Sequence, residues 1–99
     1  MKVFCCSMYQ ECDLFTKGGV YALKRSFDLA VKEIQHQINV DFEAGSITSK
    51  PELDVLYKSH DVGSEATWIA VAFSKPDDGG HRWRYRYQID ELSLDLRER

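Results

Sequence analysis

The stretch His81-Arg-Trp-Arg-Tyr-Arg-Tyr-Gln-Ile89 decides how the rest of this sequence is interpreted. Successive side chains of a β-strand point to opposite faces, so its period of two predicts a strand with an aromatic face and an arginine face. We expect the aromatic face to pack on the core, because a small domain needs these side chains there. The two faces hold Trp83, Tyr85, Tyr87 and Ile89, and Arg82, Arg84 and Arg86.

The end of the chain continues this pattern with a change of phase. Leu92, Leu94 and Leu96 alternate, but at the opposite parity from Ile89. A β-bulge or bend at Asp90-Glu91 would reconcile the two halves.

Two more strands are predicted before His81. Thr67–Phe73 is apolar at nearly every position, which is typical of an inner strand covered on both faces. Leu53–His60 alternates and predicts a half-buried strand. The segments Asp61–Glu65 and Lys75–Gly80 contain glycine, serine, aspartate and proline, so they are expected to form the intervening turns.

The N-terminal part predicts one strand and a connection. Lys2–Tyr9 is apolar on both faces, as expected for an inner strand. Glu11–Gly19 is interpreted as a connection that ends in two glycines.

A single amphipathic helix is predicted to follow. From about Tyr21, apolar residues recur every three or four positions with charged residues between them. The apolar stripe consists of Leu23, Phe27, Ala30, Val31, Ile34 and Ile38. The helix is expected to end at Asn39 or, if Phe42 extends the apolar stripe, just before Gly45. Ser46–Pro51 is then a polar link. The predicted order is β-α-β-β-β, an α+β fold with one helix on a mainly antiparallel four-stranded sheet.

Composition and cysteine use suggest one domain, residues 1–99, in a reducing compartment. Hydrophobic residues make up 43% and charged residues 29%, as in ordinary globular proteins. The three cysteines (Cys5, Cys6 and Cys12) are crowded together, whereas a secreted disulfide scaffold usually has an even number spread along the chain. No apolar run has the length of a signal peptide or a membrane span, so we expect a cytoplasmic protein with no membrane partner.

Catalytic and metal sites are not predicted. The cysteines and the histidines (His36, His60 and His81) lack the close pairing that zinc sites use, and nothing near the thiols would lower their pKa. We therefore expect a protein that is not an enzyme and holds no cofactor or metal ion.

The charge distribution favours a charged partner. Net charge is −3, yet three arginines alternate along one predicted strand, and guanidinium groups bind carboxylates and phosphates. The alternative is a solvated outer face, whose arginines meet cross-strand acids such as Asp54 or Glu65. The predicted partner-binding residues are Arg82, Arg84, Arg86, Trp83, Tyr85 and Asp54. An acidic middle segment offers another surface, made of Asp41, Glu43, Glu52, Asp54, Asp61 and Glu65.

In size, uneven charge and lack of catalytic groups, the chain is similar in kind to small virus-encoded proteins that block host defence machinery, such as anti-CRISPR proteins. This likeness rests on no motif and transfers no residues. It implies a non-enzymatic inhibitor that occludes a site on a nucleic-acid-handling or defence complex in the host cytoplasm. Nucleic-acid binding through residues 81–89 is the alternative function, and pairing of a strand edge with a second copy would give a homodimer.

Overall fold

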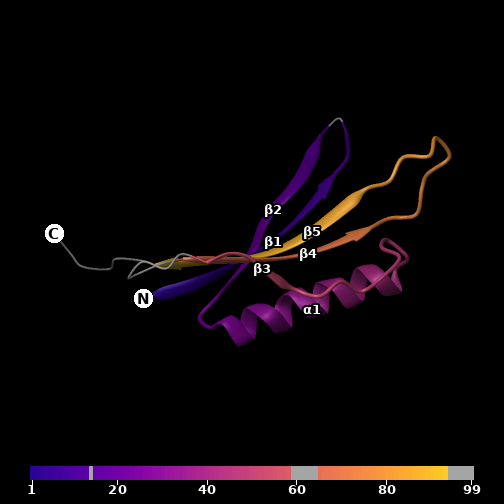
Figure 1. The fold of residues 1–99 in the computed structure, drawn as a ribbon. Helices are drawn as coiled ribbons and strands as arrows, with labels where there is room; N and C mark the ends of the chain where they lie inside the picture. The colour runs from indigo at the N-terminus through magenta and orange to yellow at the C-terminus, as the bar shows by residue number, and fades with distance from the viewer. Residues whose placement is uncertain (14, 59–64, 94–99) are drawn as a thin grey trace.

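The chain folds as one antiparallel sheet with one helix. The computed structural model describes residues 1–13, 15–58 and 65–93, with the backbone alone for residues 56–58. In chain order the elements are β1 Lys2–Glu11, β2 Thr16–Lys24, α1 Phe27–Glu43, β3 Asp54–Lys58, β4 Ala66–Phe73 and β5 Arg84–Ser93. The strand order in the sheet is β2-β1-β5-β4-β3. Helix α1 lies along one face, and the β1–β2 and β4–β5 hairpins splay apart at their tips (Figure 1). The predicted α+β class is confirmed.

The sheet has five strands rather than the predicted four, because the sequence prediction missed β2. The predicted connection at Glu11–Gly19 is wrong over most of its length: Lys17 and Gly19 belong to a strand that pairs with β1. A register shift in this pairing leaves Tyr21 as an extra residue, and such a bulge hides the period of two from a sequence pattern.

Helix α1 begins six residues later than predicted, at Phe27. Ser26 is its N-cap, and the Ser26 Oγ accepts a hydrogen bond of 3.2 Å from the Leu29 amide. The longer of the two predicted ends is confirmed, since the helix runs to Glu43 and Gly45 follows with a positive φ of 78°.

The core lies between α1 and the sheet. Ala30, Ile34 and Ile38 form the buried stripe of the helix. They face small or apolar side chains from β1, β4 and β5: Phe4, Cys6, Ala70, Ala72, Tyr87 and Ile89. The hydroxyl of Tyr87 donates a 2.6 Å hydrogen bond to Asp41 Oδ2, which ties β5 to the helix. The predicted burial of the aromatic face is therefore confirmed for Tyr87, and Tyr85 packs partly buried against the same core.

Strand β5 differs from its prediction at both ends. It begins at Arg84 rather than His81, because the preceding residues close the turn: the Trp83 amide donates a 2.9 Å hydrogen bond to Ser74 Oγ. The predicted bulge at Asp90-Glu91 is wrong, since the pairing with β1 runs without a register shift to Ser93. Leu92 simply lies on the opposite face from Ile89.

The predicted inner positions of two other strands are confirmed. β1 lies between β2 and β5, and β4 lies between β5 and β3. The predictions for His60, Leu94, Leu96 and residues 61–64 fall outside the described residues.

Candidate functional site

The face of the sheet opposite α1 is the candidate functional site, and we call it the open face. No helix or strand among residues 1–13, 15–58 and 65–93 packs over it as a second layer. Its members are the residues that alternate with the core residues of each strand. They are Val20 and Leu23 of β2, Val3, Cys5, Ser7, Tyr9 and Glu11 of β1, Arg84, Arg86, Gln88, Asp90 and Leu92 of β5, Thr67, Ile69, Val71 and Phe73 of β4, and Asp54 of β3.

Strand β5 gives the open face a charge gradient along its middle. Arg84, Arg86, Gln88 and Asp90 follow one another along this strand, so the row is basic at one end and acidic at the other. Most side chains of this face are partly or fully exposed, apart from the short Cys5 and Ser7, which are buried.

Arg86 is held in place by two neighbours on β1. Its Nε lies 3.2 Å from Glu11 Oε1, and its guanidinium carbon lies 4.7 Å from the centre of the Tyr9 ring. An ion pair combined with a cation–π contact fixes the side chain and uses part of its charge. Arg86 is thus a structural part of the open face more than a free charge.

The acidic end is also internally satisfied. Asp90 Oδ1 accepts a 2.8 Å hydrogen bond from the Thr67 hydroxyl, and Asp90 Oδ2 accepts one of 2.9 Å from the Gln88 amide. The bond from Thr67 links β4 to β5 across the face, whereas the bond from the Gln88 side chain lies within β5.

The basic end is different, because Arg82 and Arg84 are exposed and make no ion pair within the described part of the chain. The two arginines line a hollow of about 340 Å³ together with Glu11, Asp13 and Phe73. Two unpaired guanidinium groups beside an exposed aromatic ring suit a carboxylate-bearing partner.

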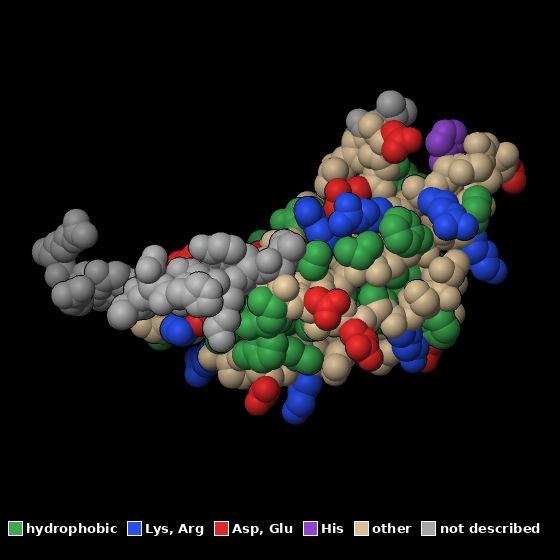
Figure 2. All heavy atoms as spheres, in the orientation of Figure 1, with side chains coloured by type: hydrophobic (Ala, Val, Ile, Leu, Met, Phe, Trp, Pro, Cys, Tyr) green, Lys and Arg blue, Asp and Glu red, His purple; other side chains and the backbone are tan. Residues whose placement is uncertain are grey.

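Apolar side chains flank the charged row on both sides. On β4 they are Ile69, Val71 and Phe73, and on β2 they are Val20 and Leu23, which are 57% and 64% exposed. The solvent face of an antiparallel sheet is normally polar, so this composition is unusual. Figure 2 shows a cluster of basic side chains over the β1–β5 region with hydrophobic side chains beside it.

The structure separates the six predicted partner-binding residues into two groups. Arg84, Arg86 and Asp54 lie on the open face, with Arg82 just beyond the start of β5. Asp54 is two strands away from β5, so it is not the cross-strand partner of the arginines; Glu11 takes that role for Arg86.

Trp83 and Tyr85 point to the other side of the sheet. Tyr85 packs against the core, and the Trp83 ring centre lies 5.3 Å from that of Phe15 and 5.1 Å from Lys17 Nζ. The sequence prediction missed Tyr9 and Glu11 of β1, and it missed the outward side chains of β4, Ile69, Val71 and Phe73. The apolar character of both faces of this strand was the available signal, but it was interpreted as burial on both faces.

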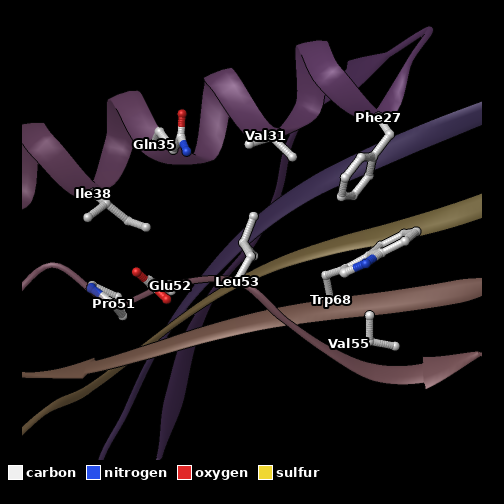
Figure 3. Close-up of a pocket in the computed structure, with 9 residues that line it drawn as sticks. All are labelled: Phe27, Val31, Gln35, Ile38, Pro51, Glu52, Leu53, Val55 and Trp68. Atoms are coloured by element: carbon white, nitrogen blue, oxygen red, sulfur yellow. The ribbon is translucent and has the colours of Figure 1, made fainter.

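A second concave feature lies between α1 and strands β3 and β4. It is a groove of about 490 Å³ with mainly apolar walls, in which Phe27 and Trp68 stand at one end with ring centres 4.3 Å apart. The polar side chains of Gln35 and Glu52 lie nearer the other end (Figure 3). The groove can admit an apolar side chain, but its shape and polar groups point to no particular reaction.

The thiols are poorly suited to act as nucleophiles. Burial and nearby Glu33 raise the pKa of Cys6 to about 11, and burial also raises the pKa of Cys5. Both thiols therefore stay protonated at neutral pH, whereas the thiolate is the reactive form. Among the described residues, no three histidine, cysteine or acidic side chains are grouped closely enough to hold a metal ion.

Comparison with protein-family models, with curated proteins and with solved structures found no match. In the described part of the chain, α1 is neither long enough nor apolar enough to cross a membrane.

Proposed function

We propose that this chain is a non-enzymatic protein-binding module that docks through its open face. The observation that carries the proposal is the combination of an uncovered sheet face, apolar flanks on β2 and β4, and a charged middle row on β5. Exposed apolar surface framed by polar groups is typical of protein interaction sites.

The size of the open face agrees with such a role. Five strands that lie about 4.8 Å apart span a width of about 19 Å. Multiplied by a length of about 26 Å along β5, this width gives a flat area of about 500 Å². The accessible area of a side-chain surface exceeds its flat area, so the face approaches the roughly 800 Å² that each partner contributes to a standard interface.

Different residues of the open face contribute to different steps of binding. Arg82 and Arg84 carry unpaired charge at the basic end, so they orient an acidic partner during the approach. Val71 and Phe73 then lose water to the partner and supply most of the affinity. Arg86 is already fixed by Glu11 and Tyr9, so it binds without a large cost in side-chain entropy.

A protein partner fits these features better than a nucleic acid. Affinity for nucleic acid comes mainly from several cations that contact phosphates. Among the described residues Arg86 is paired with Glu11, which leaves Arg82 and Arg84 as the two arginines without an ion pair. Trp83 and Tyr85, the rings of residues 81–89 that would stack on bases, lie away from the open face, since Tyr85 packs against the core and Trp83 contacts Phe15 and Lys17. In function, the module would occlude a site on a larger nucleic-acid-handling or defence assembly, as the virus-encoded inhibitors that it resembles in kind do.

Affinity capture with charge-reversed variants tests this proposal. The immobilised chain is exposed to lysate with and without nuclease treatment. The proteins retained are compared among wild type, Arg84→Glu and the matched control Lys32→Glu on the exposed side of α1. We expect a protein that wild type and the Lys32→Glu variant retain and that the Arg84→Glu variant loses. A retained set that is the same for all three variants contradicts the proposal. Retention that disappears after nuclease treatment supports the nucleic-acid alternative instead.

A further inference from the structure

Strand β2 is an edge strand with its outer side unpaired. It has nine residues and pairs only with β1, so the backbone groups on its other side meet no strand in the described part of the chain. Such an edge offers a ready template for one more strand, and natural proteins usually protect it with charged side chains.

The two lysines of β2 do not protect this edge. Lys17 Nζ lies 5.1 Å from the centre of the Trp83 ring, and Lys24 Nζ lies 4.0 Å from Glu33 on α1. Both side chains are therefore directed to partners within the molecule. The six residues between the lysines, Gly18–Leu23, carry no charge.

The apolar side chains of this segment are unusually exposed for a strand. Val20 and Leu23 are 57% and 64% exposed on the open face, and Tyr21 is 43% exposed. The opposite edge of the sheet contrasts with β2, since β3 has five residues and is bounded by Asp54 and Lys58. A short edge strand with a charged residue such as Asp54 is the usual protected form.

The sequence of β2 is complementary to itself in one antiparallel register. A two-fold axis between Tyr21 and Ala22 places Val20 of each copy opposite Leu23 of the other copy, which gives two equivalent Val20–Leu23 pairs. Both residues lie on the open face, because Val20 pairs with Ser7 and Leu23 with Cys5 of β1. Cross-strand apolar pairs of this kind stabilise a sheet.

The same register also avoids unfavourable contacts. Lys24 lies opposite Gly19 of the second copy. There is open space beside Gly19, since a Cβ added at this residue would have no atom within 4 Å. Lys17 lies beyond the paired segment, so it does not face Lys24. The bulge at Tyr21 would lie beside the bulge of the other chain, and so the two strands would bend together.

We propose that two copies of this chain pair through β2 in this register and form one continuous ten-stranded sheet with the open faces side by side. The occupant of the edge is a second copy because its own sequence supplies the complementary partner. The pairing uses the β2 side of the open face, but sedimentation tests it apart from partner capture, and it would present two docking surfaces to one target.

Sedimentation velocity over a range of concentrations tests the pairing. We expect a species with twice the 11.5 kDa mass of one chain to increase with concentration. Leu23→Lys and Val20→Glu, each as a single change, place an uncompensated charge against an apolar residue and weaken the dimer about tenfold or more. Leu29→Lys, an equally large change on exposed α1, leaves the dimerisation constant unchanged.

The double variant Val20→Glu/Leu23→Lys tests the register itself. In the proposed register, Glu at position 20 meets Lys at position 23 of the second copy, so the double variant recovers most of the lost affinity. A double variant that dimerises no better than the single ones overturns the proposal. So does a wild-type chain that remains monomeric at all concentrations, or a Leu23→Lys chain that dimerises as wild type does. Circular dichroism of each variant confirms that the fold is retained.

Discussion

On the face toward α1, β5 contributes Tyr87 and Ile89, whose side chains have no exposed area. On the open face the same strand contributes Arg86 and Gln88, which are only partly buried. Neighbouring residues of one strand thus have opposite surroundings, although they share the same backbone hydrogen bonds. The helix-covered face therefore determines the stability of this fold, while the open face leaves its side chains in contact with solvent.

The sharpest way to test this division is to truncate two adjacent residues of β5. Ile89→Ala removes buried methyl and methylene groups and leaves a cavity, so we expect a loss of about 2–5 kcal/mol in the free energy of unfolding. Gln88→Ala on the open face should change this free energy by less than about 0.5 kcal/mol. Urea denaturation measures both. If the two changes cost the same, the faces are not as different as we describe.

Alkaline pH should destabilise the covered face through Cys6. The Cys6 thiol ionises near pH 9.0 when unfolded but has a pKa of about 11 in the fold. The folded state therefore holds this proton more tightly, and its contribution is complete below pH 9.0 and lost as the pH rises to about 11. A shift of this size corresponds to about 2–3 kcal/mol. The raised pKa of Tyr87 acts in the same direction.

Urea denaturation at several pH values between 9 and 11 measures this loss. The Cys6→Ala variant should show a smaller decrease in stability over that range, although it is less stable at every pH. The matched control is Cys12→Ala, which should keep the full pH dependence. An unchanged slope in the Cys6→Ala variant would show that other groups cause the loss.

The hydrogen bond between the sheet and the helix gives the next largest effect. Tyr87→Phe removes the donor to Asp41 at 2.6 Å and leaves a carboxylate without this partner. We expect a loss of about 1.5–3 kcal/mol, the usual range for hydrogen bonds to charged groups. Tyr85→Phe is a suitable control for thermal or urea denaturation, since no hydrogen bond of the Tyr85 hydroxyl is seen in the described part of the chain. Equal stability of the Tyr87→Phe variant and wild type would contradict this description.

The ion pair of the open face should have the smallest effect on stability. Arg86 is about one-third exposed, so solvent weakens its pairing with Glu11. Replacing Arg86 with alanine should cost at most about 1 kcal/mol, which includes the contact with the Tyr9 ring. Arg84→Ala, with no ion pair to lose among the described residues, should be neutral. A cost above about 2 kcal/mol for Arg86→Ala would place this side chain in the structural core.

Much of the covered face was predictable from sequence because burial imposes periodic patterns. The alternation up to Ile89 predicted one buried side of β5, and the stripe through Ile34 and Ile38 predicted the buried side of α1. These patterns are strong since each position must exclude water along a regular element.

Strand β2 could not be predicted, for identifiable physical reasons. It is an edge strand with glycines at positions 18 and 19, and its bulge at Tyr21 breaks the period of two. Leu23 also happens to continue the spacing of the helix, so the helix was predicted to begin too early. The cap at Ser26 marks the true boundary.

The ion pair between Arg86 and Glu11 on the open face could not be predicted from the sequence either. Asp54 was a reasonable partner for the arginines in a three-stranded meander, yet β1 inserts Glu11 beside Arg86. Which strand lies next to β5 depends on the topology of the whole sheet, and no local pattern reports it.

The most direct test of the open face as a binding surface compares two exposed apolar residues. Phe73 of the open face is 44% exposed and Leu29 of α1 is 47% exposed, so Phe73→Lys and Leu29→Lys change similar surfaces on opposite sides of the molecule. The measurement is the dissociation constant of each variant for the partner identified by capture, determined by surface plasmon resonance. We predict that Phe73→Lys weakens binding about tenfold or more, while Leu29→Lys stays within about twofold of wild type. Equal affinity of the Phe73→Lys variant and wild type, or an equal loss for both variants, would contradict the account.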